Sequence, residues 1–432
     1  MTRALRALDS RTFASLHHHR NYRLFFSGQV VSVSGTWMQN IALAWVVIEL
    51  THSPVAVGAL AFCRFVPFTV FGLVAGVVAD RVDNRRLVIV TQSASMVLSA
   101  VLAVLALSGS ATLPTVYALA VLLGMAQVFD APSRQALTYQ LVGREELPNA
   151  IALNSSLFNM SRVVGPALAG IVIAAAGAGA CFVLNALSFL AVLAGLLAMR
   201  TSELHAVERA ETPTVIGGTR EGLAYVLRSH DVTLVLVIVT VMSTVGFNFN
   251  VILPLLASST LHTGPGMFGL LSACFGSGAL AGALVAATIG RASWTALLVG
   301  LFGFSGAMLA LAPLHTAWAC AILLFLLGGS FTLLTANANA LVQLGVPGHL
   351  RGRIVGLYLF AFAGLAPVGG LVAGWLVALG GTTLAFVVAG LTGLAVAAYT
   401  ITARERLRAA DLRRTRTSGQ NRRSDPASLT AG

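Results

Sequence analysis

Long apolar runs separated by short polar breaks fill the sequence from Leu24 to Thr402. A helix needs about 20 predominantly apolar residues to cross the hydrocarbon core of a bilayer. The chain is 57% hydrophobic and 10% charged, whereas a typical soluble domain is about 25% charged. The runs lack the period-two alternation of an outer-membrane β-barrel. The sequence therefore predicts an all-α membrane protein with many transmembrane helices.

Twelve of these runs are long enough to be transmembrane helices. We expect spans at residues 22–48, 55–79, 87–107, 113–135, 148–176, 180–199, 231–257, 266–289, 294–312, 316–343, 353–378 and 382–402. The odd-numbered connections contain no Arg, whereas the even-numbered connections and both tails are rich in Arg. By the positive-inside rule, both termini and the even-numbered loops are expected in the cytoplasm. This pattern predicts a multi-pass protein of the bacterial inner (cell) membrane.

A polar segment near the middle of the chain divides the spans into two sets of six. The two sets resemble each other at an offset of about 200–210 residues, with Gly58 opposite Gly269 and Arg81 opposite Arg291. Two similar halves with a substrate site between them are typical of secondary transporters. We therefore expect a cytoplasmic N-terminal segment (1–21), an N-terminal six-helix bundle (22–199), a cytoplasmic linker (200–230), a C-terminal six-helix bundle (231–402) and a disordered Arg-rich cytoplasmic tail (403–432).

The net charge of +12 lies in loops and tails beside the apolar runs. This location favours contact with anionic membrane lipids over nucleic-acid binding. The four cysteines lie far apart inside apolar runs, a pattern that indicates neither a disulfide framework nor a metal site. A short His run at 17–19 has no second cluster of ligands near it in the sequence. We expect no metal, no cofactor and no nucleic-acid partner.

Four stretches of the sequence resemble a known family. They are "NYRLFFSGQVVSVSGTWMQ" entering span one, "GVVADRVDNRR" between spans two and three, "FDAPSRQALTYQLVGREELPNAIALNSSLFN" from span four into span five, and "SRVVGPALAG" in span five. Together they resemble the major facilitator superfamily, and within it the drug and siderophore exporters, which include enterobactin- and macrolide-exporter-like proton antiporters. The resemblance covers residues 20–400 and implies two pseudo-symmetric six-helix bundles that operate by alternating access.

The loop between spans two and three contains a dense cluster that we call the gate motif: Gly76, Asp80, Arg81, Arg85 and Arg86. Membrane anchoring alone explains the arginines, but a carboxylate at the C-terminal end of a helix is unfavourable. The resemblance implies that Asp80 meets the start of span eleven, near Gly352 and Arg353, and closes the cytoplasmic side in one state. The second half has Gly290 in place of Asp80, so this contact is expected once only.

Ionisable side chains inside spans are rare, and their default interpretation is functional. Asp130 and Arg134 are one helical turn apart, so they either neutralise each other or allow Asp130 to couple protons to transport. Arg162 lies near mid-depth and either binds an anionic group or pairs with Asp130. Arg64 either has a functional role or does no more than extend toward the outer surface. These four residues are our proton-coupling candidates.

Span five contains a pattern of small residues: Ser161, Gly165, Pro166, Ala169 and Gly170. Small residues allow close backbone approach and Pro bends a helix, so generic tight packing is one interpretation. The resemblance to the antiporter motif of the exporters implies a bend that seals the cavity against proton leak. The Arg that drug antiporters usually carry in span four is absent, because Ala120 stands at that distance before Gly124.

The resemblance places the first span of each three-helix unit around a central cavity. The candidate substrate contacts on these spans are Gln29, Ser32, Thr36, Trp37, Asn40, Thr244, Phe247, Asn248, Ser330 and Asn337. Polar residues in membrane helices equally serve as hydrogen bonds between helices. Apart from its few ionisable groups this cavity is expected to be apolar, with Trp37 and Phe247 as stacking surfaces, which suits a hydrophobic or amphipathic small molecule.

The sequence contains no nucleophile–base arrangement and no phosphate-binding Gly–Lys loop. We therefore expect a monomeric secondary transporter rather than an enzyme. It would export a drug, antibiotic or siderophore by proton antiport. An uncoupled facilitator or importer of a small metabolite is the alternative within transport. A receptor or scaffold that moves no substrate is the alternative from another class.

Overall fold

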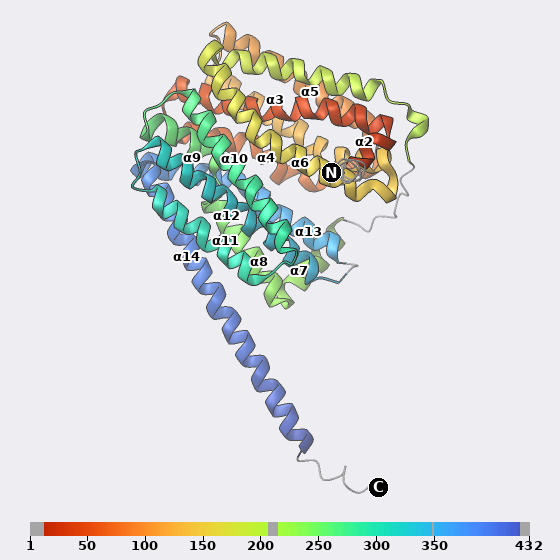
Figure 1. The fold of residues 1–432 in the computed structure, drawn as a ribbon, viewed down its shortest axis with the longest axis vertical. Coiled ribbons are helices and arrows are strands. Elements are labelled where there is room, and N and C mark those ends of the chain that lie inside the picture. The colour runs from red at the N-terminus through yellow and green to blue at the C-terminus, as the bar shows by residue number, and fades with distance from the viewer. Residues whose placement is uncertain (1–12, 206–214, 348–349, 424–432) are drawn as a thin grey trace, which may run out of the picture.

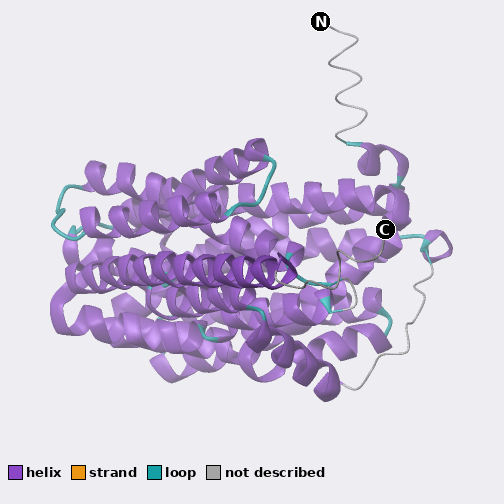
Figure 2. Ribbon diagram, turned by 90° about the horizontal axis from the view of Figure 1, so that it is seen from below, coloured by secondary structure: helices purple, strands orange, loops and turns teal. Residues whose placement is uncertain are grey.

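The computed structural model describes residues 13–205, 215–347 and 350–423, which are almost entirely helical. Figure 2 shows helices joined by short loops in the described part of the chain, with no strand among them. Nine helical stretches within these residues are long and apolar enough to cross a membrane. The first-half helices, red to yellow in Figure 1, pack beside the second-half helices, green to blue. The predicted all-α membrane fold is confirmed.

The first half of the chain forms long helices that end where the apolar runs end. Their bounds are α2 (Ala14–His18), α3 (Arg20–Thr51), α4 (Pro54–Arg81), α5 (Asn84–Leu107) and α6 (Leu113–Leu197). Helix α6 is interrupted at Gly143 (φ 68°) and Gly177 (φ 77°), two left-handed positions that glycine adopts readily. Both breaks fall inside predicted connections, 136–147 and 177–179.

The second half is more interrupted. Its elements are η1 (Thr201–Glu203), α7 (Val215–Arg228), α8 (His230–Val245), α9 (Phe249–Leu255), η2 (Leu256–Thr260), α10 (Pro265–Ile289), α11 (Trp294–Leu311), α12 (Ala317–Leu344), α13 (Arg351–Leu359), η3 (Phe360–Gly364) and α14 (Ala366–Arg423). Helix α14 is broken at Gly380 and Gly381, inside the predicted connection 379–381. The division into twelve spans stays a prediction.

The first predicted span of each half, 22–48 and 231–257, is followed by the same kind of turn. His52 (φ 51°) and His262 (φ 50°) both lie in the left-handed region, and each is followed two or three residues later by the Pro that begins the next helix, Pro54 and Pro265. These two turns are separated by the same offset as Arg81 and Arg291. The shared turn supports the internal repeat that the sequence predicts.

The end of the chain is helical as far as Arg423 in this structure, and the predicted division into domains, with its disordered tail, stays a prediction. Helix α14 continues to Arg423, where a disordered tail was expected from residue 403, and Figure 1 shows it projecting away from the other helices. The added stretch is rich in Arg and also contains Ala and Leu, all of which have high helix propensity. Residues 424–432 lie outside the described ranges.

Two close helix crossings join the halves. We call them the glycine crossings, and both lie toward the end that carries the Arg-free loops, hereafter the Arg-free end. Where α4 crosses α14, a Cβ on Gly58 would lie 2.6 Å from the carbonyl oxygen of Gly370. Where α10 crosses α6, a Cβ on Gly269 would lie 2.6 Å from the Pro166 carbonyl oxygen and 2.7 Å from the Gly170 Cα. The backbones therefore touch directly, which only small residues allow.

Candidate functional site

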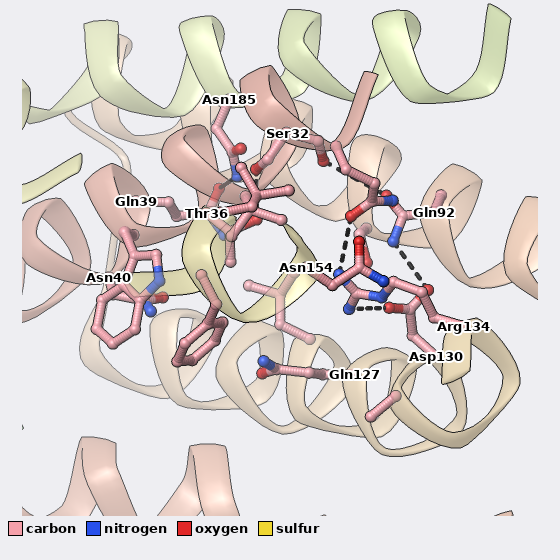
Figure 3. Close-up of a pocket in the computed structure, with 18 of the residues that line it drawn as sticks. Ser32, Thr36, Gln39, Asn40, Gln92, Gln127, Asp130, Arg134, Asn154 and Asn185 are labelled. Carbon is pink, nitrogen blue, oxygen red and sulfur yellow. Dashed lines mark hydrogen bonds and ion pairs between the residues drawn. The ribbon is translucent and has the colours of Figure 1, made fainter. Parts of the chain in front are cut away.

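A cavity of about 900 Å³ opens among α3, α4, α5 and α6, with Asn250 of α9 as its contact from the second half. Its lining runs from Ala44 and Val57, near the Arg-free end, to Tyr139 and Leu147, near the opposite Arg-rich end. Figure 3 shows polar side chains converging on this space. All five span-one candidates line it: Gln29, Ser32, Thr36, Trp37 and Asn40.

Asp130 is the centre of a buried polar network in this cavity. It is 3% exposed, and its Oδ1 accepts hydrogen bonds from Thr91 Oγ1 at 2.9 Å and Gln92 Nε2 at 2.8 Å. Its Oδ2 pairs with the Arg134 guanidinium one turn further along α6. Arg134 also donates to Gln29 Oε1 at 2.9 Å. Figure 3 shows Asp130 with its partners Gln92 and Arg134. Both carboxylate oxygens are therefore satisfied, which a buried charge requires.

Arg64 faces the same cavity from α4. Its Nη2 donates to Gln127 Oε1 at 3.5 Å, while its Nη1 is buried without a hydrogen-bond partner in the described residues. Gly124 of α6 packs against the Arg64 backbone, where any Cβ would overlap the Arg64 carbonyl oxygen. Arg64 thus lines the cavity in this structure, and its role in proton coupling stays a prediction.

A second cavity of about 200 Å³ lies between the halves, and eight of its 22 lining residues are aromatic. We call it the aromatic cavity. The Arg162 guanidinium lies 4.9 Å from the Phe275 ring centroid, 5.3 Å from that of Phe331 and 5.8 Å from that of Trp37. It does not pair with Asp130. Six residues line both cavities, so the two spaces adjoin: Trp37, Asn40, Ala44, Ala61, Phe65 and Asn250.

A helix break explains why two neighbouring Phe residues reach this aromatic cavity. Residues i and i+2 of a continuous helix point in different directions, yet Phe247 and Phe249 both line the space. The chain leaves helical geometry between α8 and α9, at residues 246–248. Phe247 then meets Phe331 at 4.9 Å between ring centroids, and Phe249 meets Phe275 at 4.1 Å.

The small residues of span five pack α6 against two neighbours. Toward α3, a Cβ on Gly165 would lie 2.5 Å from the Trp37 Cβ, and Ser34 Oγ donates to Ser161 Oγ at 3.1 Å. Toward α10, Pro166 and Gly170 form one of the glycine crossings, and Ala169 is fully buried. The pattern thus holds Trp37 beside the aromatic cavity. Its role as a seal against protons stays a prediction.

The contact expected from the gate motif is not formed in this structure. Asp80 is exposed and has no hydrogen bond or ion pair within the described ranges. Arg353 instead pairs with Glu221 of α7. The two halves meet closely at the Arg-free end, so the Asp80 end of α4 is left without a partner on the second half. The Asp80 contact therefore stays a prediction for another state.

The other members of the gate motif act within their own half. Arg85 Nε donates to the Leu196 carbonyl oxygen at 2.9 Å. Arg86 lies 3.5 Å from Asp83, which caps the start of α5. Arg81 is exposed, and no atom lies within 4 Å of a Cβ built on Gly76. The loop is thus anchored locally.

Three candidate substrate contacts lie outside both cavities. Thr244 Oγ1 donates to the Thr240 carbonyl oxygen at 2.9 Å, and Ser330 packs against Gly303 of α11. Asn337 Oδ1 accepts from the Ser293 backbone N–H at 3.2 Å, at the start of α11. In this structure these residues satisfy helix backbones and helix packing, and their role as substrate contacts stays a prediction. Phe247 and Asn248 do line the aromatic cavity.

Sequence reasoning missed most partners of the predicted residues. Thr91 and Gln92 of α5 and Gln127 of α6 are polar residues inside apolar spans, and that pattern is the signal that could have found them. The aromatic residues that were missed come from four separate helical elements, so the sequence shows no local pattern for them: Phe249, Phe275, Phe331 and Phe362. In the described part of the chain no three His, Cys, Asp or Glu residues form a metal-binding group.

Comparison with known proteins places this arrangement in context. The family described as "Transmembrane secretion effector", of the major facilitator superfamily, matches residues 10–426. The Staphyloferrin A transporter of Staphylococcus aureus is 26% identical over 357 residues, covering 81% of this chain and 87% of that protein. The Macrolide efflux protein A of Streptococcus pyogenes is 22% identical over 350 residues, covering 79% and 86%. The crystal structure of the nucleoside transporter NupG superposes with a TM-score of 0.71 at 12% identity, covering 89% of this chain and 98% of that chain.

Proposed function

Because the chain belongs to the transmembrane secretion effector family of the major facilitator superfamily, a family of transporters and not of enzymes, we propose that it exports a hydrophobic or amphipathic small molecule by alternating access. Relatives named as a staphyloferrin A transporter, a macrolide efflux protein and a multidrug efflux pump support the direction and the substrate class. These bacterial relatives also support a place in the cell membrane.

The observation that carries the proposal is a cavity whose two ends are built differently. It reaches the Arg-rich end, while the glycine crossings close the Arg-free end. With the Arg-rich end in the cytoplasm, as the positive-inside rule predicts, this conformation would receive its substrate from the cell interior. An outward-open conformation would follow when the glycine crossings separate and the Arg-rich end closes.

Asp130 supports proton coupling as the finer part of the proposal. Its carboxylate lines the cavity and pairs with Arg134. Protonation of Asp130 would remove the negative charge that pairs with Arg134. The protonation state of the pair would then follow the proton concentration on the side of the membrane to which the cavity is open. One charge moving across 100 mV supplies about 2.3 kcal/mol, which is enough to drive exchange.

Efflux from cells tests the proposal. Cells that express the chain should accumulate less of a macrolide antibiotic and of an amphipathic dye than cells with an empty vector. A protonophore should abolish this difference. If flux down a gradient persists unchanged with the protonophore, the protein is an uncoupled facilitator.

Purified protein in liposomes separates transport from the remaining alternative. The proposal predicts dye movement that depends on an imposed pH gradient. A receptor or scaffold would move no dye in either direction. That outcome, with correctly inserted and folded protein, would overturn the export proposal.

A further inference from the structure

The cavities carry more positive than negative charge. Within the described residues that line them, the cations are Arg64, Arg134 and Arg162, and the acid is Asp130. Asp130 pairs with Arg134. This leaves Arg64 and Arg162 without a carboxylate partner among the residues that the structure describes.

Neither arginine can escape its charge by losing a proton, because the guanidinium group stays protonated in proteins. Arg64 makes one long hydrogen bond to the Gln127 side chain, and its Nη1 is buried without any partner in the described part of the chain. Arg162 is held by the faces of Phe275, Phe331 and Trp37. Aromatic faces attract a cation but leave its N–H donors unused.

The surroundings of Arg162 also exclude an internal anion. The aromatic cavity is lined by aromatic, aliphatic, Ser, Asn and Pro side chains, and Arg162 is its one charged residue among those described. Next to the rings lies Asn40, which lines both cavities and whose Oδ1 is buried without a hydrogen-bond partner in the described ranges. The arginine N–H groups call for an acceptor such as a carboxylate, whereas Asn40 Oδ1 would accept from a hydroxyl or N–H donor of the same ligand.

From this arrangement we propose that the exporter takes amphipathic carboxylates, with the carboxylate bound by Arg162 and the apolar body packed on the Phe275–Phe331 rings. The inference rests on the proposed function and deepens it by naming the substrate class. A guanidinium donates two parallel hydrogen bonds to a carboxylate, which makes Arg the residue suited to this group. Arg64 lines the adjoining large cavity and adds a second positive charge near the site.

Trp37 provides a direct readout of this site. Its ring lies 5.8 Å from the Arg162 guanidinium, so a pyrene probe held there would quench its fluorescence by energy transfer. The probes are 4-(1-pyrenyl)butyrate and the neutral 4-(1-pyrenyl)butanol, which have the same apolar body. Binding is measured on the full-length protein in lipid nanodiscs, with a Trp37→Phe variant to assign the signal.

The wild-type protein should bind the butyrate about tenfold more tightly than the butanol, the size expected for hydrogen bonds to a charged group. Arg162→Gln should bring this ratio close to one by weakening only the butyrate, and Arg162→Lys should retain part of the preference. Arg64→Gln should reduce the ratio less. The matched control is Arg351→Gln, which removes an exposed arginine outside both cavities and should change neither probe.

Equal binding of the two probes by the wild type, binding of neither probe, or an equal loss of both in Arg162→Gln would each overturn the carboxylate site. Efflux of the same probes from liposomes separates this result from the proposed function. Charge-selective binding without any efflux would contradict export and leave the site standing. Efflux of both probes without selectivity would contradict the site and leave export standing.

Discussion

The two ends of the interface between the halves are built in opposite ways. At the Arg-free end, the glycine crossings at Gly58 and Gly269 bring backbone against backbone. Toward the Arg-rich end, the large cavity contains the buried Asp130–Arg134 pair, and Asp80 lies exposed at the end of α4. The closed end therefore depends on shape, whereas the open end depends on charge. Adding one methyl group should disturb the first, and removing one charge should disturb the second.

The largest effect is expected from Asp130→Asn, which removes the charge at the open end. Arg134 would lose its carboxylate, and breaking a buried pair destabilises a protein by about 3–5 kcal/mol. The lower figure applies here because the Arg134 side chain is 29% exposed to the cavity. We expect a lower melting temperature in detergent and loss of proton-driven efflux from liposomes.

A double variant separates the two roles of Asp130. Asp130→Asn with Arg134→Gln removes both charges and should recover most of the lost stability. Efflux should stay absent if Asp130 carries the proton. Normal proton-driven efflux by the single variant would contradict the coupling role of Asp130.

Gly269→Ala tests the closed end. The new methyl group would lie 2.6 Å from the Pro166 carbonyl oxygen, so the two helices must separate. Overpacking of this kind costs about 1–3 kcal/mol, which shifts a two-state equilibrium about 5- to 150-fold toward the state without the contact. A membrane-impermeant thiol reagent added at the Arg-free side should then label an Asn40→Cys residue faster, in a background without the native cysteines.

Gly264→Ala is the matched control for that experiment. It adds the same methyl group just before α10, where no atom lies within 4 Å of a built Cβ. Its labelling rate should equal that of the parent protein. Equal rates in Gly269→Ala would show that the glycine crossing does not hold this end closed.

Asp80→Asn tests whether the open end has a second, closed arrangement. Asp80 has no partner within the described ranges here, so membrane insertion and melting temperature should not change. Turnover should fall about fivefold, because a contact worth about 1 kcal/mol in the other state would be lost. The control is Asp83→Asn, which removes an acid from the same loop. Because Asp83 caps the start of α5, this change should lower stability slightly but leave turnover unchanged. Unchanged turnover in Asp80→Asn would reduce the gate motif to a membrane anchor.

The smallest effect is expected from Glu221→Gln. Glu221 is 56% exposed and pairs with Arg353, and an exposed ion pair contributes less than about 1 kcal/mol. Release of Arg353 should make it available to Asp80, so turnover should rise slightly. The rise should vanish when Asp80→Asn is also present. A rise that persists in that double variant would separate Arg353 from the gate motif.

The helices could be predicted from the sequence because each apolar run is a local signal. The breaks at Gly143, Gly177 and Gly380 fall inside the predicted connections. Asp130 and Arg134 could be paired for the same reason, since residues four apart share one face of a helix.

The partners from other helices could not be predicted from one sequence. Which face of α5 turns toward Asp130 depends on the rotation of whole helices. The polar character of Gln92 could therefore mark it as a candidate, but it could not identify Asp130 as its partner. Ser330 and Asn337 had the polar character expected of cavity residues, but that character does not distinguish a cavity from a helix interface. The aromatic cavity could not be predicted because it depends on the break between α8 and α9. In a continuous helix Phe249 would point away from Phe247, whereas the break lets both rings face the cavity.

The two arginines without a carboxylate partner, Arg64 and Arg162, also respond to the membrane potential. A cavity open to one side has nearly the potential of that side, so its fixed charges feel the membrane voltage when the access changes. The Asp130–Arg134 pair is neutral and lies on one helix, so it contributes nothing to this work. Arg64 and Arg162 together would contribute up to about 4–5 kcal/mol per 100 mV. With the Arg-rich end in the cytoplasm, a negative cell interior would attract the two arginine charges and favour the inward-open state of the empty carrier. A bound dianionic substrate would neutralise these charges, so the membrane potential would no longer oppose the outward step.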